Sequence, residues 1–168
     1  MKTLALILAL GVTTSMAQAL EVGQPVPDVG APSTSGTNAK LSDFKGKWLV
    51  VYFYPKSFTP GCTKEACSLR DGFGDIQALN ATILGVSVDD IETQKKFKAE
   101  HKLPFDLLAD DQKEVSKAFD ALGMGGFMSQ RKTFIINPEG VVAHVFASVN
   151  VSDHDAEVAD VLKTLSSK

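Results

Sequence analysis

Residue types that would indicate several common classes of protein are scarce in this chain. Its 168 residues include only two cysteines, two arginines and three histidines, and the formal net charge is −3. Because no basic cluster is present, the chain lacks the cationic surface that nucleic-acid binding requires. The three histidines, His101, His144 and His154, are scattered, so we expect surface or packing roles for them, and neither a metal site nor a cofactor.

Long apolar segments are also lacking. The run at residues 4–12 follows Lys2 and precedes the small-residue triplet Ala17-Gln18-Ala19. Because a membrane-spanning helix needs about 20 apolar residues, residues 1–19 are interpreted as a cleavable secretory signal rather than an anchor. We therefore expect an exported protein, periplasmic in a bacterial host, whose mature domain of residues 20–168 does not contact a membrane.

The mature chain shows no repeat or internal linker, and strand and helix patterns alternate along it. A Gly- and Pro-rich arm, residues 20–47, carries a small predicted hairpin at residues 29–41. Buried strands are predicted at residues 48–54, 82–88, 104–108, 133–136 and 141–147. Helices are predicted at residues 60–79, 90–102, 110–122 and from 153 to at least 165. The expected fold is a mixed β-sheet with helices on both faces.

Both cysteines lie in the stretch that follows the strand at residues 48–54. Pro55 ends this strand, Thr59 is the predicted N-cap of the next helix, and Pro60 takes its first position. Cys62 is then the third helical residue. Because the first turn of a helix carries unpaired N–H groups and partial positive charge, this position favours a thiolate over a thiol. The arrangement predicts an exposed, ionised sulfur.

Cys67 follows Cys62 by five residues. On an intact α-helix this interval corresponds to a rise of about 7.5 Å and a rotation of about 140°, whereas a disulfide tolerates Cα atoms up to about 7 Å apart. The two sulfurs could therefore bond only if the first turn unwinds. A permanent bridge is the ordinary interpretation for an exported protein, but so short a loop would stabilise it by only about 2 kcal/mol. A redox-active pair is the favoured interpretation.

The spacing Pro55-x-x-x-Thr59-x-x-Cys62, with Cys67 five residues on, resembles the active-site motif of the peroxiredoxins, and among them the Q-type or bacterioferritin-comigratory subgroup. The segments DFKGKW, YFYPK, GVSVD and RKTFIINPEG extend the resemblance over most of the mature chain. It implies a thioredoxin-like fold and an antioxidant thiol peroxidase that reduces hydrogen peroxide and organic hydroperoxides.

The resemblance implies different roles for the two cysteines. Cys62 would attack the O–O bond of the peroxide and become a sulfenic acid. Cys67 would be the resolving cysteine, which condenses with that sulfenic acid to an intramolecular disulfide, and a thioredoxin-like dithiol would reduce the disulfide by exchange. This is the atypical two-cysteine type. Because an internal resolving cysteine needs no partner chain, we expect a monomer.

Four further residues match the family pattern. Thr59 would donate its hydroxyl near the sulfur, and Pro55 would shield the sulfenic acid from water. Arg131 would hold the thiolate and stabilise charge on the leaving oxygen, while Glu65 would help to fix this arginine. The simpler interpretations are a helix cap, a strand terminator, a solvated arginine and an ordinary helix-surface glutamate. Arg70, the other arginine of the chain, is the competitor of Arg131.

One segment departs from the family pattern. Residues 122–130, LGMGGFMSQ, are short and glycine-rich, where the family has a longer charged segment. The simple interpretation is a flexible loop. The sharper hypothesis is that Met124, Phe127 and Met128 form an apolar lip that favours organic hydroperoxides.

Three rival functions remain. A thioredoxin-type thiol–disulfide oxidoreductase would have two residues between its cysteines, whereas this chain has four. A copper-binding domain on the same fold would combine thiolates with an imidazole, for which His144 is the candidate. The third is a binding domain whose cysteines form a structural disulfide.

Overall fold

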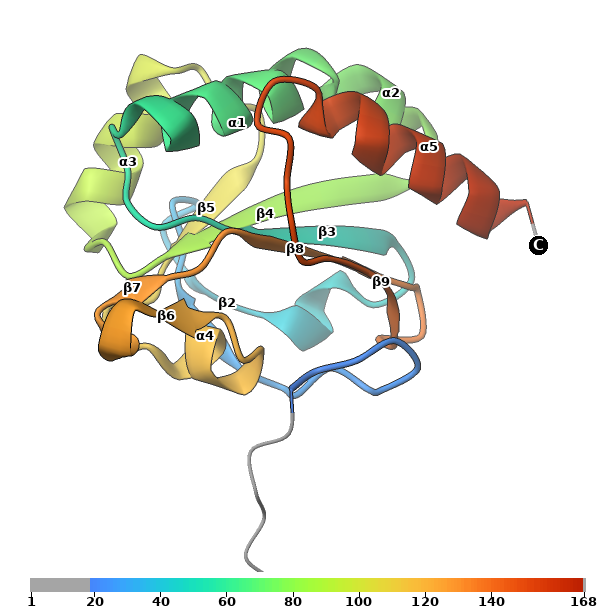
Figure 1. The fold of residues 1–168 in the computed structure, drawn as a ribbon, viewed down its shortest axis with the longest axis horizontal. Coiled ribbons are helices and arrows are strands. Elements are labelled where there is room, and N and C mark those ends of the chain that lie inside the picture. The colour runs from blue at the N-terminus through green and yellow to red at the C-terminus, as the bar shows by residue number, and fades with distance from the viewer. Residues whose placement is uncertain (1–18, 168) are drawn as a thin grey trace, which may run out of the picture.

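The apolar run WLVVYF forms the central strand of the sheet. β3 (Trp48–Phe53) pairs in parallel with β4 (Ala81–Ser87) and antiparallel with β8 (Lys132–Ile136) (Figure 1). β5 (Asp106–Ala109) and β9 (Val142–Phe146) complete the order β5-β4-β3-β8-β9. Five of the six residues of β3 are buried, because both faces of the sheet are covered. This explains why the run is continuously apolar instead of alternating.

The structure, a computed structural model, describes residues 19–167. The predicted signal at residues 1–19 therefore lies outside the described residues, except for its last position, and stays a prediction. Within the described part of the chain, no helix is both long enough and apolar enough to span a membrane.

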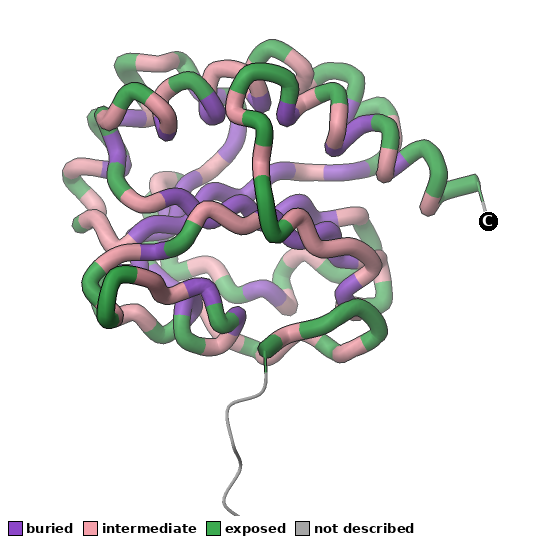
Figure 2. Tube along the Cα trace, in the orientation of Figure 1, coloured by how far each residue is buried: buried purple, intermediate pink, exposed green. Residues whose placement is uncertain are grey.

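Four helices cover one face of the sheet, with their buried sides toward it (Figures 1 and 2). The sheet contributes Val50, Tyr52 and Tyr54 to this cluster, because alternate residues of a strand point to the same face. The four helices are α1 (Pro60–Asp71), α2 (Phe73–Ala78), α3 (Ile91–Glu100) and α5 (His154–Ser166).

The opposite face carries Leu49, Val51 and Phe53, which pack into a second buried cluster. The covering elements are the predicted N-terminal hairpin, now confirmed, one 3₁₀ turn and one short helix. They are β1 (Gly30–Pro32), β2 (Asn38–Lys40), η1 (Leu41–Phe44) and α4 (Glu114–Ala118). The predicted thioredoxin-like arrangement, a mixed sheet with helices on both faces, is therefore confirmed.

The helix predicted at residues 60–79 is wrong in one respect, because it is broken at Gly72. α1 ends before this glycine and α2 begins after it. A Cβ at Gly72 would lie 2.5 Å from the Cβ of Asp155 on α5, so the glycine permits a close approach of the two helices. Ser68 strengthens this contact: its hydroxyl donates to Asp155 Oδ1 (2.7 Å) and accepts the Asp155 N–H (3.2 Å).

The helix predicted at residues 110–122 is also wrong in extent, since only α4 forms. The buried Asp110 carboxylate accepts the N–H groups of Val115 (3.0 Å) and Ser116 (2.7 Å), so the chain makes a turn before the helix begins. Lys113, at the N-cap, has a left-handed φ of 63°, which a helix cannot continue through. Residues after α4 then form a two-stranded hairpin, β6 (Leu122–Gly123) and β7 (Met128–Ser129), around η2 (Met124–Gly126).

Candidate active site around Cys62

A short loop after the C-terminal end of β3 leads into α1, and Cys62 is the third residue of this helix. Thr59 occupies the N-cap with extended backbone angles, and Pro60 is the first helical residue, as predicted. The Thr59 hydroxyl, however, makes no capping bond; it donates to the carbonyl oxygen of Lys56 (2.9 Å). Thr59 therefore begins the helix through its backbone, and its hydroxyl bonds within the loop rather than to the sulfur.

A buried polar network that the sequence prediction missed fixes this loop. The Ser57 N–H donates to Asp89 Oδ2 (2.7 Å), and the Ser57 hydroxyl donates to Gln94 Oε1 (3.3 Å). Tyr54 donates to the same Gln94 oxygen, and the Gln94 amide donates to the Ser87 hydroxyl (2.9 Å). One signal for this network was present in the sequence. Gln94 lies three positions before Phe97, so a polar side chain is predicted on the inward side of the helix.

Phe58 shows that the loop is held under strain. Its φ of 65° is left-handed, a rare conformation for an aromatic residue. The ring packs edge-on against Phe97, with centroids 5.1 Å apart, and lies 6.1 Å from His101. These contacts, together with the hydrogen bonds of Ser57, hold the residues before Cys62 in one conformation.

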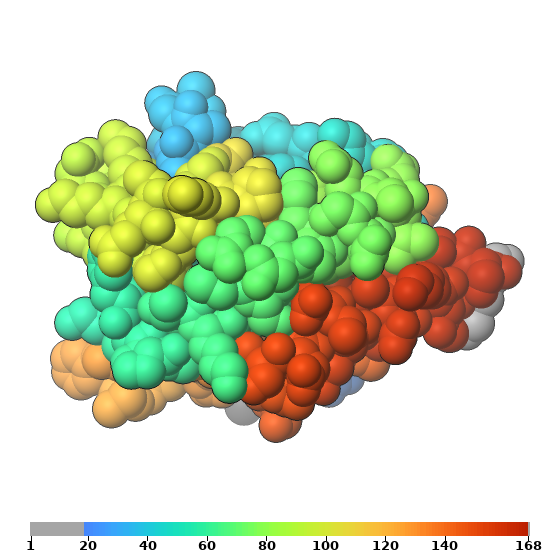
Figure 3. Space-filling view, turned by 90° about the horizontal axis from the view of Figure 1, so that it is seen from above, coloured from blue at the N-terminus to red at the C-terminus, as the bar shows by residue number. Residues whose placement is uncertain are grey.

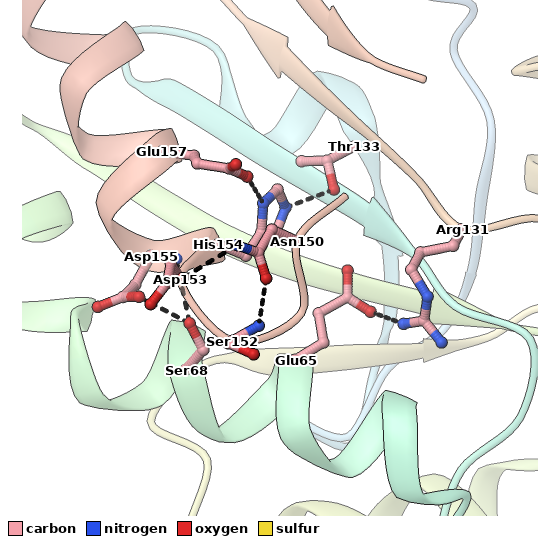
Figure 4. Close-up of polar contacts among 10 residues, drawn as sticks. All are labelled: Glu65, Ser68, Arg131, Thr133, Asn150, Ser152, Asp153, His154, Asp155 and Glu157. Atoms are coloured by element: carbon pink, nitrogen blue, oxygen red, sulfur yellow. Dashed lines mark hydrogen bonds and ion pairs between the residues drawn. The ribbon is translucent and has the colours of Figure 1, made fainter. Parts of the chain in front are cut away.

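Cys62, Glu65 and Arg131 come together at the start of α1. Arg131 Nη2 donates to the Cys62 sulfur (3.3 Å), and Arg131 Nη1 forms an ion pair with Glu65 (Figure 4). Cys62 and Glu65 are three residues apart on one helix, so both reach a guanidinium that enters from the segment before β8. Gly61 leaves room for it, since a Cβ there would lie 3.3 Å from Nη2.

The rival arginine is not at this site. Arg70 pairs with Asp71 and donates from Nη1 to the carbonyl oxygen of His101 (3.0 Å), at the C-terminal end of α3. The structure therefore places Arg131, and not Arg70, at the sulfur of Cys62.

The prediction of an exposed sulfur is wrong. Cys62 is only 1% exposed, whereas the side chain of Arg131, which contacts the sulfur, is 24% exposed. The sulfur is thus buried, and the guanidinium that contacts it is partly exposed. Glu65 is fully buried, so the alternative of an ordinary helix-surface glutamate is also excluded.

Comparison with known proteins identifies the family. Residues 22–145 match the AhpC/TSA family. The chain is 44% identical over 155 residues to peroxiredoxin Bcp of Bacillus subtilis, which covers 89% of this chain and 99% of that protein. The chain belongs to the peroxiredoxins. Two solved structures agree: PrxQ of Xylella fastidiosa (30% identity, TM-score 0.82) and the bacterioferritin comigratory protein of Xanthomonas campestris (33%, 0.79). Each covers 88% of this peroxiredoxin and 98% of its own chain.

At the peroxiredoxin site, burial and ion pairing act in opposite directions on the pKa values of Glu65 and Arg131. Burial raises the pKa of Glu65 from 4.5 to about 7, although the Arg131 guanidinium acts in the opposite direction. Burial would lower the pKa of Arg131, but Glu65 and then the Cys62 sulfur outweigh it and raise this pKa. Arg131 therefore stays cationic beside the sulfur. Glu65 Oε1 is buried and has no hydrogen-bond partner among the described residues.

The raised pKa of Glu65 predicts a loss of stability with rising pH. Between about pH 4.5 and 7 the folded protein keeps a proton that the unfolded chain has released, so the free energy of unfolding falls as pH rises. In the wild type, the free energy of unfolding should fall by on the order of 1–3 kcal/mol across this window because of Glu65. The Glu65→Gln variant has no such carboxyl group and should lack this fall. Urea unfolding of the reduced protein at pH 5 and pH 7.5 measures it.

The matched control is Glu92→Gln, which removes an exposed carboxylate paired with Lys95. This variant is expected to keep the pH dependence of the wild type. An unchanged pH dependence in Glu65→Gln would contradict the assignment of the buried proton to Glu65.

The remaining predicted site residues lie close by in the chain. Pro55 is half-buried in the loop before α1. Cys67 is half-buried on the same helix as Cys62, and both cysteines are free thiols on a continuous α1. The prediction that the two sulfurs do not bond while the helix is intact is therefore confirmed.

The histidines serve packing. His154 is buried at the start of α5, where Nε2 lies 2.8 Å from the Thr133 hydroxyl and Nδ1 lies 3.3 Å from Glu157 (Figure 4). Burial lowers its pKa. His144 packs edge-on against Phe146, with centroids 4.5 Å apart. The part of the chain that the structure describes contains no group of three potential metal ligands.

The segment before Arg131 presents apolar side chains to solvent. Met124 and Phe127 are each 75% exposed, and Met128 is half-buried. Lys113 Nζ lies 5.7 Å from the centre of the Phe127 ring, which places this ring beside α4. The exposure agrees with an apolar lip, and the preference for organic hydroperoxides stays a hypothesis.

Proposed function

We propose that this peroxiredoxin reduces peroxides through the sulfur of Cys62. The observation that supports it most directly is the guanidinium of Arg131 on a sulfur in the first turn of α1. Both the helix end and the arginine favour the thiolate, which is the reactive form. The thiolate attacks one peroxide oxygen and forms the S–O bond as the O–O bond breaks. The second oxygen leaves as an alkoxide or hydroxide, which Arg131 stabilises until it is protonated.

We assign the resolving step to Cys67, which can reach Cys62 once the first turn of α1 unwinds. Its thiolate displaces hydroxide from the Cys62 sulfenic acid, which yields a disulfide and water after protonation. A thioredoxin-like dithiol then restores both thiols and becomes a disulfide itself. We include in the proposal that the chain acts as a monomer and is exported by residues 1–19. The internal bridge is supported by the presence of both cysteines in one helix whose first turn can unwind, and export is supported by the sequence of residues 1–19.

The substrate class includes organic hydroperoxides. The printed title of the Xanthomonas campestris structure refers to alkyl peroxide reduction by that relative. In this chain the exposed Met124 and Phe127 lie shortly before Arg131 in the sequence and could contact an alkyl group. Equal rates for hydrogen peroxide and cumene hydroperoxide, unchanged by Met124→Gln and Phe127→Gln, would count against the apolar lip.

A single-turnover experiment tests the function. Reduced protein is mixed with one equivalent of hydrogen peroxide, quenched rapidly, and analysed by mass spectrometry. We expect oxidation many times faster than that of free cysteine, ending in a disulfide that has lost two hydrogen atoms. Cys67→Ser should instead gain one oxygen atom as a trapped sulfenic acid. Cys62→Ser should lose the fast reaction.

The rival functions predict other results. A thiol–disulfide oxidoreductase, or a domain with a structural disulfide, would react with peroxide as slowly as free cysteine. Such a rate in the wild-type protein would overturn the proposed function. If the Cys62→Ser variant is still oxidised rapidly, Cys62 is not the nucleophile.

A further inference from the structure

The loop that leads into α1 is attached to α3 by one side chain, Gln94. This glutamine is fully buried, and its amide group makes four hydrogen bonds, the largest number that it can form. Nε2 donates to the Leu108 carbonyl oxygen (2.8 Å) and to the Ser87 hydroxyl (2.9 Å). Oε1 accepts the hydroxyl groups of Tyr54 and Ser57. Gln94 thus joins α3 to β4, to β5 and to the loop after β3.

The orientation of the Gln94 amide is fixed by its partners. A backbone carbonyl can only accept, so the amide nitrogen faces Leu108 and the amide oxygen faces the loop. Asp89 closes the network on the other side, because its Oδ2 accepts both the Ser87 hydroxyl (2.8 Å) and the Ser57 N–H (2.7 Å). The Gln94 amide therefore cannot turn over without losing bonds to the sheet and to the loop.

Ser57 connects this network to the first turn of α1. Its N–H and its hydroxyl are both bound, and it lies five residues before Cys62. Within this interval the Thr59 hydroxyl donates to the Lys56 carbonyl oxygen (2.9 Å), and the Thr59 carbonyl oxygen accepts the Thr63 N–H (2.9 Å). The loop and the first turn of α1 are thus held together, and a shift at Ser57 is expected to displace the backbone of Cys62.

An apolar contact of α3 also supports the loop. Phe97 follows Gln94 by three residues, so both side chains lie on the inward side of α3. The Phe97 ring packs against Phe58, with centroids 5.1 Å apart, and against Tyr54, with centroids 5.9 Å apart. Figure 3 shows the loop and α1 side by side with α3 on one face of the molecule. Because hydrogen bonds are directional and apolar contacts are not, the bonds of Gln94 fix the exact position of a loop that Phe97 only holds close.

We propose that Gln94 and Asp89 are positioning residues for the oxidation of Cys62. Through Ser57 they hold the first turn of α1, so that the Cys62 sulfur stays against the guanidinium of Arg131. The inference rests on the proposed function of Cys62. Arg131 Nη2 donates to the sulfur at 3.3 Å, so a displaced first turn would weaken or break this contact. A misplacement of about 1 Å caused far from the reacting atoms can lower a rate by about 10²-fold.

The disulfide step makes the opposite demand on the loop. Cys62 reaches Cys67 only when the first turn of α1 unwinds, and a loop held by Gln94 opposes that movement. Loss of the Gln94 bonds should therefore slow the oxidation of Cys62 without slowing the formation of the disulfide. A smaller fraction of folded protein would instead reduce the amplitude of both phases and leave both rates unchanged. The two rates thus separate a positioning role from a purely structural one.

The test measures both phases of the single turnover with hydrogen peroxide at pH 7. Gln94→Leu keeps a side chain of similar volume and removes both polar atoms of the amide. We expect the first phase, the oxidation of Cys62, to slow by roughly tenfold, and the second phase to keep the wild-type rate or exceed it. A first phase at the wild-type rate, or an equal slowing of both phases, would overturn the inference.

Thr93→Val and Leu41→Ala are the matched controls. Thr93 precedes Gln94 on α3, and its hydroxyl donates to Asp90 Oδ2 (3.2 Å), away from the loop. Leu41 is buried in the cluster on the opposite face of the sheet, so its truncation lowers stability without removing a contact of the loop. Both variants should keep both rates of the wild type. A slow first phase in either control would show that the effect is not specific to Gln94, and the inference would fail.

A second pair of variants covers the case in which Gln94→Leu folds poorly. Asp89→Asn keeps an oxygen that can accept the Ser57 N–H and the Ser87 hydroxyl, whereas Asp89→Ala removes it. The first phase should be slow in Asp89→Ala and close to the wild-type rate in Asp89→Asn. Equal rates in these two variants would contradict the inference. Failure of the proposed function is distinguishable, because Cys62 of the wild-type protein would then not oxidise rapidly.

Discussion

Replacing Arg131 with methionine is expected to slow the oxidation of Cys62 by hydrogen peroxide by about 10²- to 10³-fold, the usual cost of removing one donor that stabilises developing charge. In the wild type, Nη2 of Arg131 bonds the sulfur directly (3.3 Å), and no other arginine can replace it because Arg70 is bound to Asp71 and His101. The measurement is the first phase of the stoichiometric reaction with peroxide. Arg131→Lys should recover only part of the rate, because a lysine cannot hold both the sulfur and Glu65 with one planar group.

Removing Arg131 also leaves Glu65 buried without its partner, which could lower stability for a reason unrelated to catalysis. The double variant Arg131→Met, Glu65→Gln removes this charge and should show the same slow oxidation. Lys132→Met is the matched control. Lys132 is adjacent to Arg131 and carries the same charge, but it donates to the Asp120 carbonyl oxygen (2.7 Å). Oxidation of the double variant at the wild-type rate would exclude Arg131 from the chemistry.

The parts of the site that sequence could predict are those set by local chain chemistry. The strand at residues 48–54, the stop at Pro55 and the helix start at Thr59 and Pro60 follow from propensities of adjacent residues, and all were confirmed. The helix placement of Cys62 followed from them. The position of Arg131 came from a resemblance to a family, since 69 residues separate it from Cys62 and no local rule joins them.

Most of the errors concern contacts between distant elements. The Cys62 sulfur is buried in contact with the guanidinium of Arg131, which enters from the segment before β8. The break at Gly72 depends on Asp155, and the late start of α4 depends on a buried Asp110 carboxylate. The Gln94 network joins two strand ends and a helix. The contacts of Arg131, Asp155 and Gln94 join segments far apart in the chain, which propensities of adjacent residues do not encode. The Asp110 contact is local, but a turn closed by a buried carboxylate was not recognised in the helix pattern.

Formation of the Cys62–Cys67 disulfide is expected to remove helical protection from the first half of α1. On the intact helix the two Cα atoms are too far apart and point in different directions for a bridge, so oxidation must open the backbone hydrogen bonds of residues 63–67. A helical amide that opens at a cost of about 3 kcal/mol exchanges roughly 10²-fold more slowly than an unstructured one. Loss of this protection is measured by hydrogen–deuterium exchange on the reduced and the disulfide forms.

The loss should stop where α1 is attached to its neighbours. Ser68 is bonded to Asp155, and the Gly72 N–H donates to the Ser68 carbonyl oxygen (3.1 Å), so protection of Gly72 and of the first turn of α5 should persist. Cys67→Ser treated with the same peroxide is the control, because it is oxidised but forms no bridge and should keep its protection. If residues 63–67 exchange equally slowly in both redox forms, the disulfide does not form by unwinding α1. Protection lost throughout α1 and α5 would instead show that the Ser68–Asp155 contact does not limit the opening.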